Sequence, residues 1–257
     1  MFHYEEPKFK KKRLLRVEML EQLRDYPRNY LDISFRGYSD GIVSGCQISW
    51  DAKRLTIEPG ILYYGKKLYF MEQPYYLDCD FEDRVRYLKV QFLAELQEEG
   101  KVEGKTRILL DEKKPDSACE MELCHFRLQE GARLRHGYES FEDYATEYDT
   151  INFIQVPYAS YGQPTLHPNI MKQFAKEILQ MKSQDYYDIS FAMNVMANEG
   201  KVSADFICSY LQARVGTEVR EGNQALYEGL REVLKLQISG PSHKKEQEKG
   251  KRQVMLL

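Results

Sequence analysis

Hydrophobic positions change their period twice along the chain. In residues 10–26, Leu15, Met19 and Leu23 recur at every fourth position, which predicts an amphipathic helix with a basic first turn. The basic charges there oppose the helix macrodipole, so a partner surface is one way to compensate them. Pro27 is expected to end this helix.

Residues 30–160 are rich in Val, Ile, Tyr and Phe, with turn signals at short spacing. Short strands in this arrangement are typical of an antiparallel sandwich or small barrel. In the last long strand, Phe126 and Leu128 are expected to face the core. The predicted strands are Cys46–Trp50, Arg54–Ile57, Ile61–Tyr64, Lys67–Met71, Arg86–Leu96, Thr106–Asp111, Met121–Leu128 and Thr150–Val156.

Helical periodicity returns after residue 168 and predicts a bundle of three or four helices. The first begins at Pro168, and the second ends near Gly200. Ser203 is expected to cap a third helix that Gly216 closes, and Thr217 to cap a fourth. The apolar positions that mark these helices are Ile170, Phe174, Ile178 and Met181 in the first, Tyr187, Phe191 and Val195 in the second, Phe206, Ile207, Tyr210 and Leu211 in the third, and Val219, Leu226, Leu230 and Val233 in the fourth.

These patterns predict an α+β protein with an N-terminal helix, an antiparallel β-sandwich or small barrel-like domain and a C-terminal helical bundle. The segment 157–168 holds three prolines and one glycine, which indicates a linker or an ordered loop at a domain boundary. We expect a helical arm over 1–29, a β-rich domain over 30–160, a helical domain over 161–238 and a disordered basic tail over 239–257.

Composition narrows the class of protein. Of the 257 residues, 42% are hydrophobic and 30% charged, which is enough for a sizeable core. The net charge of -3 excludes a strongly basic nucleic-acid coat, and no apolar run approaches a membrane span. The five cysteines are widely spaced, as expected of reduced thiols in a protein made in the cytoplasm, and the N-terminus lacks the apolar region of a secretion signal.

No catalytic motif is present. A zinc site would need more ligands than Cys119, Cys124 and His125 provide, and no P-loop, G-x-G-x-x-G or H-E-x-x-H sequence occurs. We therefore expect neither enzymatic activity nor a cofactor. An enzyme of unrecognised type that uses Cys124, His125 or His136 stays open as an alternative.

A second alternative is a nucleic-acid-associated protein that uses its basic termini, over residues 8–16 and 244–252. The predicted bundle argues against it. Between Pro168 and Ile238 there are eight Lys or Arg and nine Asp or Glu, so the bundle as a whole is not basic.

Glycines punctuate residues 38–70, YSDGIVSGCQISWDAKRLTIEPGILYYGKKLYF. Asp40-Gly41 signals a turn, and Gly45 precedes a short strand. Pro59-Gly60 has the composition of a type II turn, with Gly60 at positive φ, and Gly65 separates two further strands. These positions predict a compact meander of very short strands.

The order of these elements resembles the N-terminal region of baseplate and tail-fibre-attachment proteins of contractile phage tails and phage-like injection particles. Such proteins carry a leading helix, a G-V-V-x-G-like turn and a β-unit of the form x-V-x-P-G-x-A-x-x-x-G-x-x-I. The match spans residues 14–135. Gly41, Ile42, Val43 and Gly45 match the turn, and Ile57, Pro59, Gly60, Gly65 and Leu68 match the β-unit.

The resemblance implies a structural assembly component at the baseplate or fibre junction of such a particle. There is no fibrous repeat, which favours an adaptor over a receptor-binding fibre. The implied partners are other tail or baseplate proteins, with several copies per particle and no nucleic acid. The expected contact residues are Leu15, Met19, Leu23, Tyr63 and Tyr69, because apolar stripes and tyrosines supply contact area.

Overall fold

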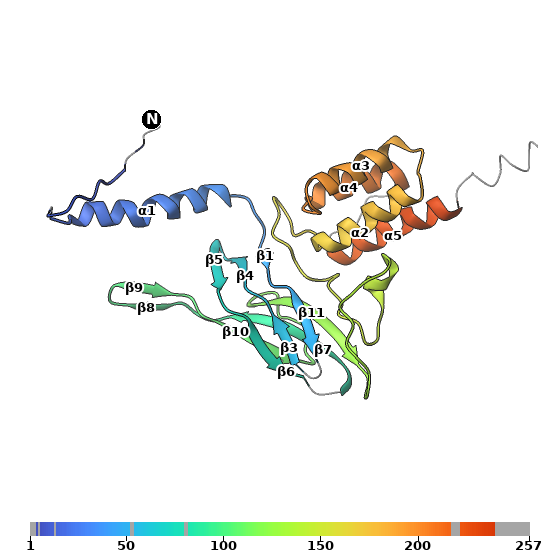
Figure 1. Cartoon of the computed structure of the whole chain (residues 1–257), viewed down its shortest axis with the longest axis horizontal. Coiled ribbons are helices and arrows are strands. Elements are labelled where there is room, and N and C mark those ends of the chain that lie inside the picture. Colours follow the sequence, from blue (N-terminus) through green and yellow to red (C-terminus); the bar gives the residue numbers. More distant parts are fainter. Residues whose placement is uncertain are drawn as a thin grey trace, which may run out of the picture. The chain divides into compact units, whose positions relative to one another are not determined.

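The computed structural model describes residues 4, 6–12, 14–51, 54–79, 82–216 and 222–239 (Figure 1). Two compact units divide the chain, Met1–Tyr38 and Ser39–Leu257. The first unit holds one helix, and the second holds the described strands and the remaining helices. The fold is α+β, with a leading helix, antiparallel sheets and C-terminal helices, as the sequence pattern predicts. The four predicted domain boundaries stay predictions.

The leading helix α1 spans Val17–Ser34, so the predicted helix over 10–26 was wrong at both ends. It begins later because the basic residues before it would oppose the dipole of a helix N-terminus. Pro27 lies inside the helix and does not end it. The apolar periodicity continues beyond it with Tyr30 and Ile33, and no residue of α1 is buried, so water can reach the carbonyl that Pro27 leaves unbonded.

Short strands form two three-stranded antiparallel sheets in the first half of the second unit. Their orders are β1-β4-β5 and β2-β3-β6. The strands are β1 (Gly41–Gly45), β2 (Ile48–Asp51), β3 (Arg54–Ile57), β4 (Gly60–Tyr64), β5 (Lys67–Met71) and β6 (Tyr75–Asp78).

A third sheet has the order β10-β7-β11, and the hairpin β8-β9 extends away from the other strands (Figure 1). The ring of Tyr64 in β4 stacks on that of Phe92 in β7 at a centroid distance of 3.7 Å, which joins two of the sheets. The strands are β7 (Glu82–Phe92), β8 (Leu96–Glu98), β9 (Lys101–Glu103), β10 (Thr106–Asp111) and β11 (Glu120–Leu128).

Three predicted strands coincide with β3, β5 and β10, but Thr150–Val156 is not a strand. Its backbone forms hydrogen bonds with two separate segments, one at His125 and the other at Arg135. Each contact is an isolated β-bridge, so no continuous ladder forms. The Asn152 side chain also accepts a hydrogen bond from Ile154 N–H at 2.9 Å, which favours a local turn over a strand ladder.

Two hydrophobic clusters form the core of the second unit. One is built from the strands and includes Phe126 and Leu128, which confirms their predicted core position. The other is built from the helices together with residues of the preceding segment, such as Phe141 and Ile154. Side chains of the loop after β11 therefore contribute to the helical core.

Four helices follow: α2 (Pro168–Gln180), α3 (Tyr186–Ala197), α4 (Ala204–Val215) and α5 (Asn223–Ser239). Ser203 Oγ accepts a hydrogen bond from Phe206 N–H at 3.2 Å, and Gly216 ends α4 at a φ of 71°, so both predicted caps are confirmed. The expected roles of Thr217 and Val219, and the tail beyond α5, lie outside the described residues.

A buried carboxylate connects these helices. Asp188 in α3 is fully buried, whereas its neighbour Tyr187, predicted to mark the apolar face, is 62% exposed. Met181 after α2 is exposed as well, so both predicted positions were wrong. Asp188 accepts hydrogen bonds at 2.7 Å from Tyr210 and at 3.3 Å from Arg214, both in α4. Gln237 of α5 donates to the same carboxylate. One side chain therefore holds three helices together.

Replacement of Asp188 by Ala is expected to lower the free energy of unfolding by about 3–5 kcal/mol, because it leaves a partly buried Arg214 without one of its carboxylates. Urea unfolding followed by circular dichroism measures this change. The exposed carboxylate of Glu232 on α5 provides a matched control, since E232A should change the free energy by no more than about 0.5 kcal/mol. Equal effects of the two variants would contradict a linking role for Asp188.

Candidate functional site

The predicted apolar stripe lies on and just before α1. Met19 and Leu23 belong to the helix, whereas Leu15 precedes it. Leu15 and Leu23 are exposed, and no residue of α1 is buried in the described chain. An amphipathic helix with an uncovered apolar face offers a surface for another helix or protein.

Gly41, the first residue of β1, allows the backbone of residues 157–159 to approach this strand closely. A Cβ at this position would lie 2.5 Å from Ala159 N and 2.8 Å from Pro157 O, and both are backbone atoms. The approach permits two hydrogen bonds with Ile42, from Ile42 N–H to Pro157 O at 2.8 Å and from Ala159 N–H to Ile42 O at 2.9 Å. β1 is therefore a strand bound on both sides, where the sequence indicated a turn.

The segment after these contacts also binds the helices. Thr165 pairs with Tyr158 through two backbone hydrogen bonds, and its hydroxyl donates to Val202 O at 2.8 Å. Asn223, the first residue of α5, donates to Val156 O at 2.7 Å and to Thr165 O at 3.1 Å. The proline-rich boundary segment is therefore an ordered loop that connects strand β1 to the helical core.

Gly45 and Gly60 face each other at the other end of β1. A Cβ on Gly45 would lie 2.1 Å from Pro59 O, and one on Gly60 would lie 2.3 Å from the Cys46 sulfur. Gly60 does not have positive φ, so the predicted type II turn at Pro59-Gly60 was wrong. Both glycines are required because the two backbones cross too closely for side chains.

Gly65 and Lys66 form the two-residue turn between β4 and β5. Both have positive φ, 55° and 63°, which is typical of a type I′ hairpin turn. Gly65 N–H donates to Asp40 Oδ1 at 3.0 Å, so this turn is also bonded to the residue before β1. Gly41, Gly45 and Gly60 thus lie in strands of the β1-β4-β5 sheet, and Gly65 lies in its turn. Pro59 directly precedes β4, whereas Ile57 belongs to β3 in another sheet.

The tyrosines expected at an interface are largely covered. Tyr63 is only 8% exposed, and the half-buried Tyr69 packs against Phe92 with ring centroids 5.1 Å apart. Neither offers much area to a partner, because both fill the packing of this sheet. The exposed aromatic residues of this region are Phe70, Tyr75 and Tyr76.

Helix α3 carries an exposed apolar face that the pattern does not separate from its core face. Tyr186, Ile189, Met193 and Met196 are exposed, while Phe191 and other residues of the helix are buried. Spacings of three and four residues place the exposed four on one side. A sequence signal for this second face exists, because α3 is apolar on both sides. Packing on a single core requires only one apolar side.

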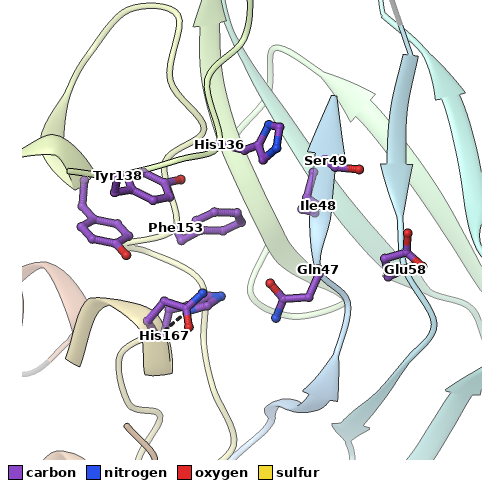
Figure 2. A pocket seen from close by; sticks show the side chains of 10 residues that line it. Gln47, Ile48, Ser49, Glu58, His136, Tyr138, Phe153 and His167 are labelled. Carbon is purple, nitrogen blue, oxygen red and sulfur yellow. Dashed lines mark hydrogen bonds between the residues drawn. The ribbon is translucent and has the colours of Figure 1, made fainter. Parts of the chain in front are cut away.

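A pocket of about 270 Å³ lies between the start of β2, the end of β3, the loop after β11 and the start of α2. Figure 2 shows Tyr138, Phe153 and His167 on one side of it, with residues of the strands opposite. The lining residues include one carboxylate and no cysteine, so thiolate chemistry and paired-carboxylate chemistry are absent from this pocket. They are Gln47, Ile48, Ser49, Glu58, His136, Tyr138, Tyr144, Phe153, His167 and Asn169.

His167 is the most buried polar residue of this lining, at 4% exposure. Its Nδ1 accepts a hydrogen bond from Asn169 N–H at 3.0 Å and caps α2, so the neutral ring carries its proton on Nε2. Burial, and secondarily the charge of Lys172, lowers the pKa of His167 to about 4. The residue is therefore a neutral structural cap at neutral pH.

The residues of the enzyme alternative do not form a reactive group. Cys124 is fully buried, and burial raises the pKa of its thiol well above the ordinary value, which disfavours the thiolate. His125 Nδ1 lies 2.6 Å from Glu122 Oε1 and is engaged there. His136 is exposed at the pocket. The arrangement supports no nucleophile activated by a base.

Within the described part of the chain, no cluster of three or more His, Cys, Asp or Glu side chains is arranged to hold a metal ion. Among the same residues, no helix combines the length and hydrophobicity that crossing a bilayer requires. The second basic tract, over residues 244–252, lies outside the described residues.

No family model matches the chain, and no curated protein matches it either. Two solved structures that match the chain contain TssK, one of them in a type VI secretion system baseplate subcomplex. A chain of the TssK-TssF-TssG baseplate subcomplex matches with a TM-score of 0.41 and 8% identity, over 91% of this chain and 99% of that one. A crystal structure of TssK matches with a TM-score of 0.40 and 10% identity, over 93% of this chain and 69% of that one.

The first of these chains belongs to a baseplate subcomplex of a type VI secretion system. Identities of 8–10% with TM-scores near 0.4 do not assign this chain to a family. Its function therefore follows from its own surfaces and residues.

Replacement of Gly41 by Ala is expected to lower the free energy of unfolding by about 2 kcal/mol or more, because the new methyl group would overlap the backbone of residues 157–159. Gly137 offers a matched control, since it has open space around it and no positive φ, and G137A should stay within about 0.5 kcal/mol of wild type. Urea unfolding measures both variants. A neutral G41A would show that the close approach is not required.

The buried His167 predicts a stability that depends on pH. Its pKa is lowered to about 4 in the folded chain, so between pH 6.5 and 4 the unfolded chain binds more protons at this residue. Its contribution to stability is complete above pH 6.5 and falls by about 3 kcal/mol as the pH drops to 4. H167N keeps a capping side chain but cannot titrate, so the stability difference between wild type and variant should change with pH over this range.

Unfolding free energies measured at several values between pH 4 and 7 test this expectation. The exposed histidine of the same pocket supplies the control, because H136N should leave the fall between pH 6.5 and 4 unchanged. A wild type and an H167N variant with parallel pH profiles would contradict the assignment of a neutral buried His167.

Proposed function

We propose that this chain is a structural component of the baseplate of a contractile injection particle, at the baseplate or fibre junction, that acts through protein-protein contacts. The observation that carries the proposal is α1, an amphipathic helix of 18 residues without a buried side chain. A helix of this kind is stabilised chiefly by packing of its apolar face against another surface.

The β-unit supports the class of particle. The residues of the resemblance, GIVSG and LTIEPGILYYGKKLYF, form β1, β3, β4 and β5. Gly41, Gly45 and Gly60 are fixed by backbone contacts, so they describe a specific strand arrangement rather than flexible turns. The resemblance therefore concerns a defined three-dimensional unit.

The exposed surfaces support a role in contacts. Apolar side chains are exposed on α1, on the β5 and β6 region and on α3, for instance Tyr30, Phe70 and Met193. The pocket beside His167 has no reactive pair, which favours a function without catalysis. The partners we propose are other tail or baseplate proteins, in an assembly of the kind that the TssK-TssF-TssG baseplate subcomplex represents.

Labelling of intact particles tests the proposal. Particles purified from the native host are labelled with an antibody against this chain and viewed by negative-stain electron microscopy. We expect label at one end of a tail-like particle. Particles from a strain that lacks the chain serve as the control for unspecific labelling. A chain found free and absent from every particle would overturn the proposal.

A further inference from the structure

The pocket beside His167 is large enough for a small molecule. Its volume is about 270 Å³, and every residue that lines it belongs to the second unit (Figure 2). A buried water needs only about 10–15 Å³, whereas sites for drug-sized ligands measure about 300–1,000 Å³. The pocket therefore has room for a compact ligand of one ring.

Four rings form a continuous wall on one side of this pocket. Tyr144 stacks on Tyr138 with ring centroids 3.9 Å apart, and Tyr138 contacts Phe153 edge to face at 6.2 Å. The ring of Phe153 in turn lies 5.0 Å from that of His167. Because each ring is held by the next, the wall is a preformed surface against which a flat molecule can pack.

His167 adds a hydrogen-bond donor to this wall. Its Nδ1 accepts from Asn169 N–H at 3.0 Å, so the neutral ring carries its proton on Nε2. In the described part of the chain, Nε2 has no hydrogen-bond partner and is not among the unpaired polar atoms closed off from solvent. It therefore faces the pocket that His167 lines. Burial lowers the pKa of His167 to about 4, so this donor is uncharged at neutral pH.

The hydroxyl of Tyr144 is a second group of this kind. Tyr144 is 4% exposed and lines the same pocket. Its hydroxyl also lacks a hydrogen-bond partner among the described residues, and it is not closed off from solvent either. Two side chains that are more than nine-tenths buried thus carry unpaired polar groups at this pocket. Such groups cost free energy unless a ligand or water satisfies them.

The charge of the lining restricts the ligand. Glu58 carries a carboxylate on the strand side, and no Lys or Arg is among the residues of the lining. A ligand anion would meet this carboxylate without a cation to compensate its desolvation. A ligand cation could pair with Glu58, but it would leave the Nε2–H of His167 without an acceptor. The lining therefore favours an uncharged ligand that has both an acceptor and a donor.

We propose that this pocket binds a small, flat, uncharged molecule that carries a carboxamide group. The carboxamide oxygen accepts a hydrogen bond from His167 Nε2–H. Its NH₂ group donates to the strand side, where Gln47 and Glu58 supply acceptor oxygens (Figure 2). The ring of the ligand packs against the aromatic wall. The site goes beyond the proposed assembly function, because it assigns a ligand to a structural protein.

Three probes of one shape and different charge test the proposal. Benzamide is neutral, benzoate is an anion and benzamidine is a cation at pH 7. Each is titrated into the nitrogen-15-labelled full chain and followed by NMR. Benzamide should bind with a millimolar dissociation constant, at least about tenfold more tightly than the other two. Benzoate or benzamidine binding as tightly as benzamide, or binding of none of the three, would overturn the proposal.

A variant of His167 tests the donor. H167N keeps an acceptor for Asn169 N–H, but its shorter side chain removes the Nε2–H from the pocket. It should bind benzamide at least about fivefold more weakly than wild type. In the wild type, the ring N–H signal that is missing from the H167N spectrum should shift when benzamide is added. Unchanged affinity in H167N, or an unshifted signal, would contradict the assigned hydrogen bond.

A second variant fills the pocket without touching the buried wall. Gln47 is exposed and lines the pocket, so Q47W places a large ring in the space of the ligand. This variant should lose benzamide binding. Q97W is the matched control, because Gln97 is equally an exposed glutamine but lies in strand β8, outside the lining. Equal affinities of Q47W and Q97W would show that benzamide binds elsewhere and would overturn the site.

An aliphatic amide separates a ring-bearing ligand from the side-chain amide of a protein partner. Isobutyramide has the same carboxamide group but no ring, as a glutamine side chain does. It should bind more weakly than benzamide, because it cannot pack flat against the aromatic wall. Equal affinity for the two amides would overturn the flat ligand in favour of a protein side chain.

These titrations use the purified chain and do not depend on the particle. Benzamide binding without label on any particle would leave this site standing and overturn the proposed function. Label on the particle without benzamide binding would do the reverse.

Discussion

The arrangement of the second unit depends on how closely its backbone segments approach strand β1. At Gly41 and Gly45 a single methyl group would overlap neighbouring backbone atoms, and Gly60 has no room for one either. Because these positions lack side chains, β1 bonds to β4 on one side and to residues 157–159 on the other. The latter segment continues into the helical core, so the strands and the helices are positioned by the same contact.

Exposed apolar area is the second organising feature. The chain keeps many tyrosines inside, where Tyr63 and Tyr69 complete the packing of the β-unit. It leaves apolar faces uncovered on α1 and α3, on helices whose remaining faces are polar or packed. Surfaces of this kind are typical of proteins that function in an assembly, where the last apolar contacts form between chains.

Local signals predicted much of the fold. Strands β3 and β5 lie between turn signals and coincide with their predictions, and Ser203 and Gly216 cap α4 because capping needs only neighbouring residues. The sequence was misleading where a residue serves a distant contact. Gly60 is glycine because Cys46 lies against it, and Asp188 is buried because Tyr210 and Gln237 of two other helices bond to it.

The sequence by itself determined the α+β class, the helical periods and the glycine positions of the β-unit, since these depend on residues close together in the chain. Only the tertiary structure decided which side chains stay available. It buried Tyr63 and Asp188 and placed Gly41 against residues 157–159. Burial and close approach arise from segments far apart in sequence, and no local pattern encodes which segments meet.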